Sequence, residues 1–310
     1  MNELEEITVF APATVANVAC GFDVLGFALS VPGDTIHVKK NDSNTLFISK
    51  INGAPDLSLA PEKNVVGVSI QALLNELNSK QGFDIEVTKG VKPGSGIGSS
   101  AASSAGAVWA VNQLLNANFS ETDLVRFAME GERLASGAAH ADNVAPAIMG
   151  GFTLVRSYEP LDIVKLNTPQ DLYCTIIHPQ IEVKTSDARS VLRTGISLKK
   201  AIIQWGNVGG LVAGLFLEDY KLIGRSLQDV IIEPIRSELI PGFDNVKRAA
   251  LNAGALGCSI SGSGPSIFAL SKGVEQAEKV RIAMSQIYHQ IGIEYLTYVS
   301  AVSKSGVSIL

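Results

Sequence analysis

The sequence has little of what marks a secreted, membrane-embedded or nucleic-acid-binding protein. Its three cysteines, Cys20, Cys174 and Cys258, are odd in number, lie far apart and lack metal-ligand spacing, so we expect reduced thiols. It has no run of about 18 apolar residues, which argues against a membrane span. The opening residues, MNELEEITVFAP, are acidic, opposite in sign to a signal peptide. A net charge of −5 provides no basic face for nucleic acid. We therefore expect a cytoplasmic protein that binds neither membranes nor nucleic acid.

The composition is that of a folded chain with a large core. Apolar residues make up 46% of the sequence and charged residues only 18%, which excludes a disordered protein. A length of 310 residues fits two domains, because one domain usually has about 100–200. No low-complexity linker separates the halves, and we expect the boundary between residues 155 and 170.

Periodicity predicts a mixture of strands and helices. We expect Pro12 and Ala13 to end the first strand, and Ser120 with Asp123 to form a capping box at the start of a helix. Hairpin-like strand pairs favour an α+β fold over a doubly wound parallel sheet. The expected strands cover 5–10, 34–40, 45–51, 83–88, 151–156, 172–177, a strand–loop–strand at 256–270, and 293–302. The expected helices cover 65–77, 101–115, 120–135, 198–218, 242–253 and 274–290.

A glycine loop between a predicted strand and a predicted helix is the strongest functional signal. The segment KPGSGIGSSAAS runs from Lys92 to Ser103. Its glycines allow positive φ and close approach to a ligand, and its N–H groups, with the start of the next helix, form a cradle for an anion. A Walker A loop is excluded because it needs a lysine that is missing here. A dinucleotide fingerprint is excluded because Ser99 follows Gly98. The alternative is a tight turn whose small residues serve packing alone.

This loop resembles PxxxGxGSSAA, the phosphate-binding signature of the GHMP kinases. Two further segments, APATVANVACGFDVLGFAL (Ala11–Leu29) and CSISGSGPSIFAL (Cys258–Leu270), resemble the first and third motifs of that family. The resemblance implies a two-domain fold, with a ribosomal protein S5 domain 2-like half at 1–160 and a ferredoxin-like α/β sandwich at 161–310. It also implies an ATP-dependent kinase that acts on an alcohol group.

The first motif is similar to that of the homoserine kinase branch. Thr14 stands where galactokinases and mevalonate kinases carry Lys or Arg, and the segments His140–Gly151, Val183–Leu192 and Glu233–Phe243 also resemble this branch. The resemblance therefore implies L-homoserine as the acceptor and threonine biosynthesis as the pathway. A GHMP kinase with another small alcohol as acceptor, and a non-catalytic sensor with the same fold, stay open as alternatives.

The resemblance also implies which residues bind the acceptor. A planar guanidinium can bind both oxygens of a carboxylate, which suits Arg189 and Arg236 to the carboxylate of an amino acid. Asp23, together with Asn17, suits the ammonium group. The implied acceptor-binding residues are Asn17, Asp23, His140, Arg189, Arg236 and Gly262.

A third set of residues is implied for ATP and Mg²⁺. Mg²⁺ takes few protein oxygens, and we assign Ser100 and Glu132 to it. Glu132 lies eight residues before His140, whereas Glu130 is two positions away on another face of the expected helix. The implied ATP-binding residues are Asn64, Lys89, Pro93, Gly94, Ser95, Gly96, Ile97, Gly98, Ser99 and Ser100.

The group that assists deprotonation of the hydroxyl stays open. Relatives in the mevalonate kinase branch use an Asp aided by a Lys, and the Lys or Arg partner is replaced by Thr14 here. Asp142 or Asn143 is expected to orient the hydroxyl, and Thr185 to lie near the γ-phosphate. The family resemblance also implies a homodimer, although no periodicity identifies the interface.

The glycine loop yields a first prediction. Gly96→Val should weaken nucleotide binding while leaving the fold largely intact, because the loop has no Walker lysine and must bind phosphate through backbone N–H groups. Calorimetry with ATP measures the effect, and an unchanged nucleotide affinity would contradict the assignment.

Overall fold

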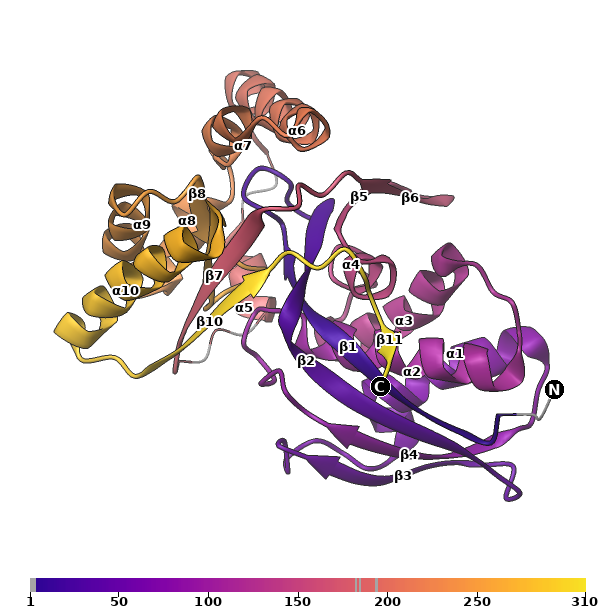
Figure 1. Cartoon of the computed structure of the whole chain (residues 1–310). Helices are drawn as coiled ribbons and strands as arrows, with labels where there is room; N and C mark the ends of the chain where they lie inside the picture. The colour runs from indigo at the N-terminus through magenta and orange to yellow at the C-terminus, as the bar shows by residue number, and fades with distance from the viewer. Residues whose placement is uncertain (1–3, 182, 184, 193–194) are drawn as a thin grey trace.

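The chain folds into two β-sheets with helices packed on them (Figure 1). The computed structural model describes residues 4–181, 183, 185–192 and 195–310. A seven-stranded sheet has the order β11-β1-β2-β4-β3, and the hairpin β5-β6 joins it at β2. A four-stranded sheet has the order β10-β7-β9-β8. The expected α+β class is confirmed.

The first sheet is built around two long antiparallel strands. The strand β1 (Glu6–Ala16) runs through Pro12, so the predicted break at Pro12 and Ala13 is wrong. The register shifts between Pro12 and Thr14, and such an irregularity lets a strand accept a proline without a lost ladder bond. Its partner β2 begins at Leu25, well before the predicted residue 34. The remaining strands of this half are β2 (Leu25–Asn41), β3 (Leu46–Asn52) and β4 (Gly82–Thr88).

The helices α2 and α4 pack directly on this sheet, and α1 and α3 pack mainly on α2 and on each other (Figure 1). The helix α2 is almost wholly buried because its residues are small, and a Cβ added at Gly106 would lie 2.9 Å from Ala11. The capping box of Ser120 and Asp123 is present as predicted. The helices are α1 (Val65–Leu77), α2 (Ser99–Leu115), α3 (Glu121–Ser136) and α4 (Val144–Met149), with a 3-10 turn at Pro61–Lys63 before α1.

The second half repeats the pattern of strands covered by helices. Its longest helices, α6, α9 and α10, agree with the predicted ranges to within about two residues. The short α4, α5, α7 and α8, and the strand β6, were not predicted, because they are too short for a periodic signal. The strands are β5 (Phe152–Tyr158), β6 (Leu161–Leu166), β7 (Leu172–Pro179), β8 (Gly257–Ile260), β9 (Ile267–Lys272), β10 (Tyr295–Ala301) and β11 (Ser308–Ile309). The helices are α5 (Thr185–Ser190), α6 (Leu198–Leu217), α7 (Tyr220–Ser226), α8 (Glu233–Arg236), α9 (Phe243–Asn252) and α10 (Val274–Ile291), with a 3-10 turn at Ser237–Leu239.

The two halves share a core, and the last strand of the chain joins the sheet of the first half. The expected division at residue 160 falls inside the β5-β6 hairpin, and β11 at the C-terminus pairs with β1. The ring of Phe27 lies 4.8 Å from Phe152 and 6.0 Å from Phe268, which joins the first sheet to the second. The three cysteines are free and buried, as expected. A division into 1–160 and 161–310 stays a prediction.

The helix α6 exposes an unusual amount of apolar surface. By length and composition it could cross a membrane, with a mean hydropathy of 1.2, and 28% of this stretch is buried inside the protein. The sequence analysis expected a helix at 198–218 but no candidate for a membrane span. A single helix of this kind is weak support for a span, since helices of non-membrane proteins pass the same test. The side chains of Ile202, Trp205 and Leu217 are more than half exposed.

The shared core yields a second prediction. Phe27→Ala should lower the free energy of unfolding by about 3–5 kcal/mol, because the loss of the aromatic ring leaves a cavity between the two sheets. Phe47 is 58% exposed on β3, so Phe47→Ala is the matched control and should change stability by less than about 0.5 kcal/mol. Urea denaturation followed by circular dichroism measures both. Equal losses in the two variants would show that Phe27 does not hold the halves together.

Candidate active site

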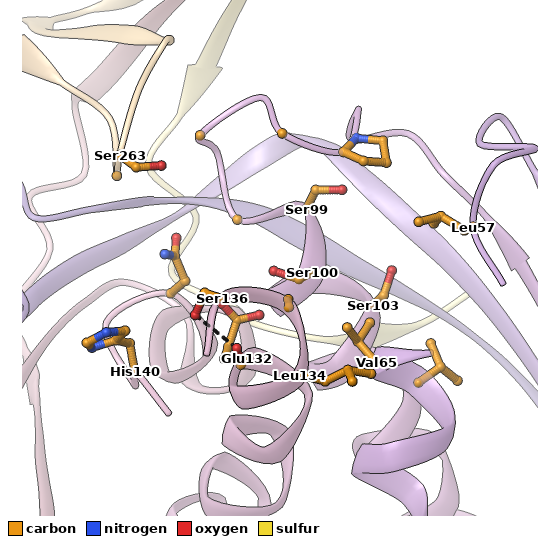
Figure 2. A pocket seen from close by; sticks show the side chains of 18 of the residues that line it. Leu57, Val65, Ser99, Ser100, Ser103, Glu132, Leu134, Ser136, His140 and Ser263 are labelled. Carbon is orange, nitrogen blue, oxygen red and sulfur yellow. Dashed lines mark hydrogen bonds between the residues drawn. The ribbon is translucent and has the colours of Figure 1, made fainter. Parts of the chain in front are cut away.

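A cavity of about 520 Å³ contains most of the predicted site residues. One end is lined by apolar side chains, and the other by charged groups. Figure 2 shows Ser99 and Ser100 at the head of α2, with Leu57 and Val65 on one side and His140 away from them. The apolar end is lined by Ile51, Leu57, Val65, Val66, Val87 and Leu134. The charged end is lined by Asn17, Asp23, His140, Asp142, Arg189 and Arg236.

The glycine loop lies between these ends and packs against the third motif. Gly96 has a φ of +78°, and a Cβ added there would lie 2.5 Å from the carbonyl oxygen of Gly264. Ser261 donates a hydrogen bond to the carbonyl oxygen of Gly96 at 2.8 Å. A valine at residue 96 would therefore displace the backbone of the other half. The expectation that Gly96→Val leaves the fold largely intact does not hold at this contact.

A buried ion pair supports the loop from below. The carboxylate of Asp34 on β2 contacts the ammonium of Lys89. It also accepts hydrogen bonds from the backbone amides of Gly90 and Val91. Lys89 also donates to the carbonyl oxygen of Ser99 and the hydroxyl of Ser103, both at 2.8 Å. Burial lowers the pKa of Lys89, while the charge of Asp34 opposes this shift. The sequence analysis missed Asp34, although an aspartate within an alternating strand was a usable signal.

The other residues predicted for ATP lie around the loop in different ways. Asn64 lines the cavity, but its side-chain amide is already hydrogen-bonded. Its oxygen accepts from Val66 N at 3.0 Å, which caps α1, and its NH₂ group donates to Ser58 O at 2.7 Å. Pro93, Gly94, Gly96, Gly98, Ser99 and Ser100 line the cavity as well. Ser95 and Ile97 are buried and do not line it.

Glu132 and Ser100 face each other across the cavity floor. Glu132 lies on α3 and is buried; its Oε1 has no hydrogen-bond partner, and burial raises its pKa to about 7 against a hydrogen bond from Ser100. In Figure 2, the hydroxyl of Ser136 bonds to the backbone carbonyl of Glu132 and not to its carboxylate. Glu130 points elsewhere and pairs with Arg133 at 3.0 Å. The two glutamates are thus separated as their spacing predicts.

Asp142 and Asn143 lie at the start of α4 beside the loop. The hydroxyl of Thr14 donates to Oδ1 of Asn143 at 2.8 Å, so the amide oxygen of Asn143 is occupied and its NH₂ group is left as a donor. A Cβ at Gly98 would collide with Thr14, which brings the loop against this pair. Asp142 is buried, and its pKa is raised to about 7 by burial and then by the charges of Asp23 and Glu132.

Opposite charges pair at the charged end of the cavity, which contains the residues predicted to bind the acceptor and is called the acceptor end. Arg189 donates to Oδ2 of Asp23 at 2.6 Å, and its Nη1 lies 2.9 Å from Nε2 of His140. Nδ1 of His140 lies 3.8 Å from Asp23. Burial lowers the pKa of His140; Asp23 opposes the shift and the arginines add to it. Three residues predicted from distant parts of the sequence therefore meet in one cluster.

Arg236 is the buried member of this end, at 3% exposure. Its Nε donates to Ala188 O at 2.9 Å, and its Nη1 to Gly262 O at 3.3 Å. Asn17 also donates to Gly262 O, at 2.7 Å. The ring of Phe22 lies 4.9 Å from the guanidinium of Arg236, a cation–π contact that the sequence analysis missed. Thr185 is the first residue of α5, and its side chain lies outside the described residues.

Family models match both halves of the chain. The model of the GHMP kinases N terminal domain matches residues 64–151, and that of the GHMP kinases C terminal matches residues 211–290. The chain is 49% identical to a homoserine kinase of Chloroherpeton thalassium, over 99% of this chain and 100% of that relative. It is 38% identical to a homoserine kinase of Methanococcus maripaludis, over 87% of this chain and 89% of that one.

Solved structures agree with these matches. A crystal structure of homoserine kinase from Cytophaga hutchinsonii has a TM-score of 0.96 and 56% identity, covering 100% of this chain and 99% of that one. A mevalonate kinase of L. major in complex with R-mevalonate has a TM-score of 0.72 at 16% identity, covering 94% and 95%, and shows the shared fold alone. The two-domain GHMP kinase fold implied by the three motifs is confirmed, and the chain belongs to the homoserine kinase family of the GHMP kinases.

Proposed function

We propose that the protein transfers the γ-phosphoryl group of ATP to the side-chain hydroxyl of L-homoserine, giving ADP and O-phospho-L-homoserine, a step of threonine biosynthesis. The observation that carries this proposal is the cluster of Asp23, Arg189 and Arg236 beside the glycine loop in one cavity. This cluster offers charges of both signs, which suits a free amino acid. The homoserine kinases to which the chain is similar support the same acceptor.

ATP would lie along the cavity from its apolar end to the glycine loop. The apolar side chains suit an adenine ring, and the N–H groups of the loop and of the head of α2 suit the phosphates. Lys89 is engaged with Asp34 and Ser99, so we assign it to holding the loop in shape as well as to the nucleotide side of the cavity. Asn64 likewise orders the start of α1 at the adenine end.

The residues at the cavity floor fit a magnesium ion. Glu132 has a buried carboxylate oxygen without a partner, and the hydroxyl of Ser100 lies beside it. Mg²⁺ is bound by one or two protein oxygens together with phosphate oxygens and water, so Glu132 and Ser100 would hold it. When bound, the ion neutralises charge on the transferring phosphoryl group.

Asp142 and Asn143 would act on the hydroxyl of the acceptor. Asn143 cannot take a proton, and its NH₂ group is oriented by Thr14 as a donor. Asp142, whose pKa is raised to about 7 by burial, can exchange a proton near neutral pH and is the better acceptor of the proton. We assign the orienting role to Asn143 and the late uptake of the proton to Asp142. Thr185 near the γ-phosphate, a cytoplasmic location and a homodimer stay predictions from the family.

Release of ADP with homoserine as the sole acceptor tests this function. We expect turnover with homoserine and little with mevalonate, galactose or shikimate, which lack the ammonium group. 1,4-Butanediol, which offers the hydroxyl without either charge, should be rejected because it brings no carboxylate to the buried Arg236 and no ammonium to Asp23. Homoserine esters should fall between. If butanediol is phosphorylated as efficiently as homoserine, the amino-acid clamp does not exist.

The clamp itself yields a third prediction. Arg236→Leu should lower kcat/KM for homoserine by roughly ten- to a hundredfold, since a charge-assisted hydrogen bond contributes about 1.5–3 kcal/mol and about 1.4 kcal/mol is a factor of ten. The KM for ATP should change little. Asp23→Asn should act on the ammonium in the same direction. Arg225 is exposed on α7 away from the cavity, so Arg225→Leu is the control and should leave both constants unchanged.

The metal assignment yields a fourth prediction. Glu132→Gln keeps the size of the side chain and removes its charge, so turnover should fall and recover in part at high Mg²⁺. In the wild type, Glu132 takes up a proton as the pH falls through about 7, so the Mg²⁺ concentration for half-maximal rate should rise between about pH 8 and pH 6. This dependence should flatten in the glutamine variant.

Glu130→Gln is the matched control for the metal site. Glu130 lies on the same helix but pairs with Arg133 outside the cavity, so its loss should leave the Mg²⁺ requirement unchanged. A damaging Glu130→Gln together with a silent Glu132→Gln would mean that the wrong carboxylate has been assigned.

A further inference from the structure

The segment that carries Asn17 and Asp23 is held in an uncommon backbone conformation. Asn17, Val18 and Ala19 have φ values of 69°, 39° and 57°, and Asp23 has 59°, although none of them is glycine. Residues other than glycine rarely adopt this left-handed conformation, and they keep it only when surrounding contacts hold them there. Something outside the segment must therefore keep it in place.

Gln204 of α6 supplies such a contact. Its side chain is buried, at 7% exposure, and its Nε2 donates to the carbonyl oxygen of Cys20 at 2.9 Å. Cys20 lies between the left-handed turn at 17–19 and Phe22 and Asp23 at the acceptor end. The contact thus fixes the middle of the segment. Gln204 does not line the cavity.

The same amide also holds the turn that leads to Arg236. Nε2 of Gln204 donates to Oδ1 of Asp229 at 3.0 Å, and Oε1 accepts from Val230 N at 3.1 Å. Asp229 in turn accepts hydrogen bonds from the backbone amides of residues 231, 232 and 233, which lead into the first residue of α8. Arg236 is the last residue of that helix. Both walls of the acceptor end are therefore tied to one side chain.

We propose that Gln204 is a positioning residue for the acceptor site: it holds Asp23 and Arg236 at the spacing that recognises both charges of the substrate. The proposal rests on the proposed function, because the acceptor is taken to be an amino acid. The residues that line the nucleotide side of the cavity, such as Asn64, Ser100 and Glu132, make no hydrogen bond to α6 among the described residues. A loss at Gln204 should consequently affect homoserine and spare ATP.

Gln204→Leu in the full chain is the first test. It keeps a side chain of similar size but removes three hydrogen bonds, one of them to a carboxylate, so kcat/KM for homoserine should fall by about ten- to a hundredfold. The KM for ATP should stay within about twofold. Asn207 lies on the same helix and donates to Gln228 O at 3.0 Å, whereas the hydrogen bonds to Cys20 and Asp229 come from Gln204. Asn207→Leu is therefore the matched control and should leave both constants unchanged.

Gln204→Glu provides a second readout that a merely structural role would not change. The introduced carboxylate cannot donate to Cys20 or Asp229 and is repelled by Asp229, whereas its protonated form can donate once. The ratio of kcat/KM for homoserine in this variant to that in the wild type should therefore rise as the pH is lowered from about 8 to 6. If Gln204→Leu does not fold by circular dichroism, this ratio alone decides.

Three results would overturn the proposal. Equal changes in the homoserine and ATP constants of Gln204→Leu, or no change in either, would remove the positioning role, and so would a pH-independent ratio in Gln204→Glu. Failure of the proposed function is seen separately in the wild type. If the wild type phosphorylates another alcohol and not homoserine, the same comparison is made with that acceptor, and the positioning role is judged there.

Discussion

The contact between two glycine loops is the constraint on which the site depends. The first loop follows β4 in one sheet and the second joins β8 to β9 in the other, and their backbones meet at Gly96 and Gly264 without room for a side chain. The amide of Gly262 donates to Ala16 O at 3.2 Å, which adds the end of β1 to the same contact. All three motifs therefore converge where the two halves meet, and the cavity is the space that this arrangement leaves.

Burial and pairing of charge divide the cavity into regions with different chemistry. At the acceptor end, Asp23 and Arg189 form an ion pair at partial exposure. At the floor, Glu132 and Asp142 are buried without an ion-pair partner in contact, and burial raises both pKa values to about 7, although the charges of Lys89 and Arg189 oppose the shift. The former arrangement suits recognition of a zwitterion, and the latter suits metal binding and proton uptake near neutral pH.

Much of the fold was predictable because the long elements carry strong periodic signals. The ranges of α1, α6 and α10 follow from apolar stripes, and the capping box at Ser120 follows from local hydrogen bonding. The path of β1 through Pro12 was not predictable, because the bulge that accepts the proline depends on its pairing with β2. The short α5 and α8, which carry Arg189 and Arg236, form only against their tertiary neighbours.

The sequence by itself determined the family, the glycine loops and the residue types at the site, because motif spacing and backbone freedom are local properties. It also separated Glu132 from Glu130, since residues two apart on a helix point to different faces. Only the tertiary structure decided which groups face each other: Asp34 with Lys89, Thr14 with Asn143, and Gln204 with Asp229. These pairs join residues between 25 and 129 positions apart, and no local pattern encodes such a contact, because it arises from the packing of separate elements into one core.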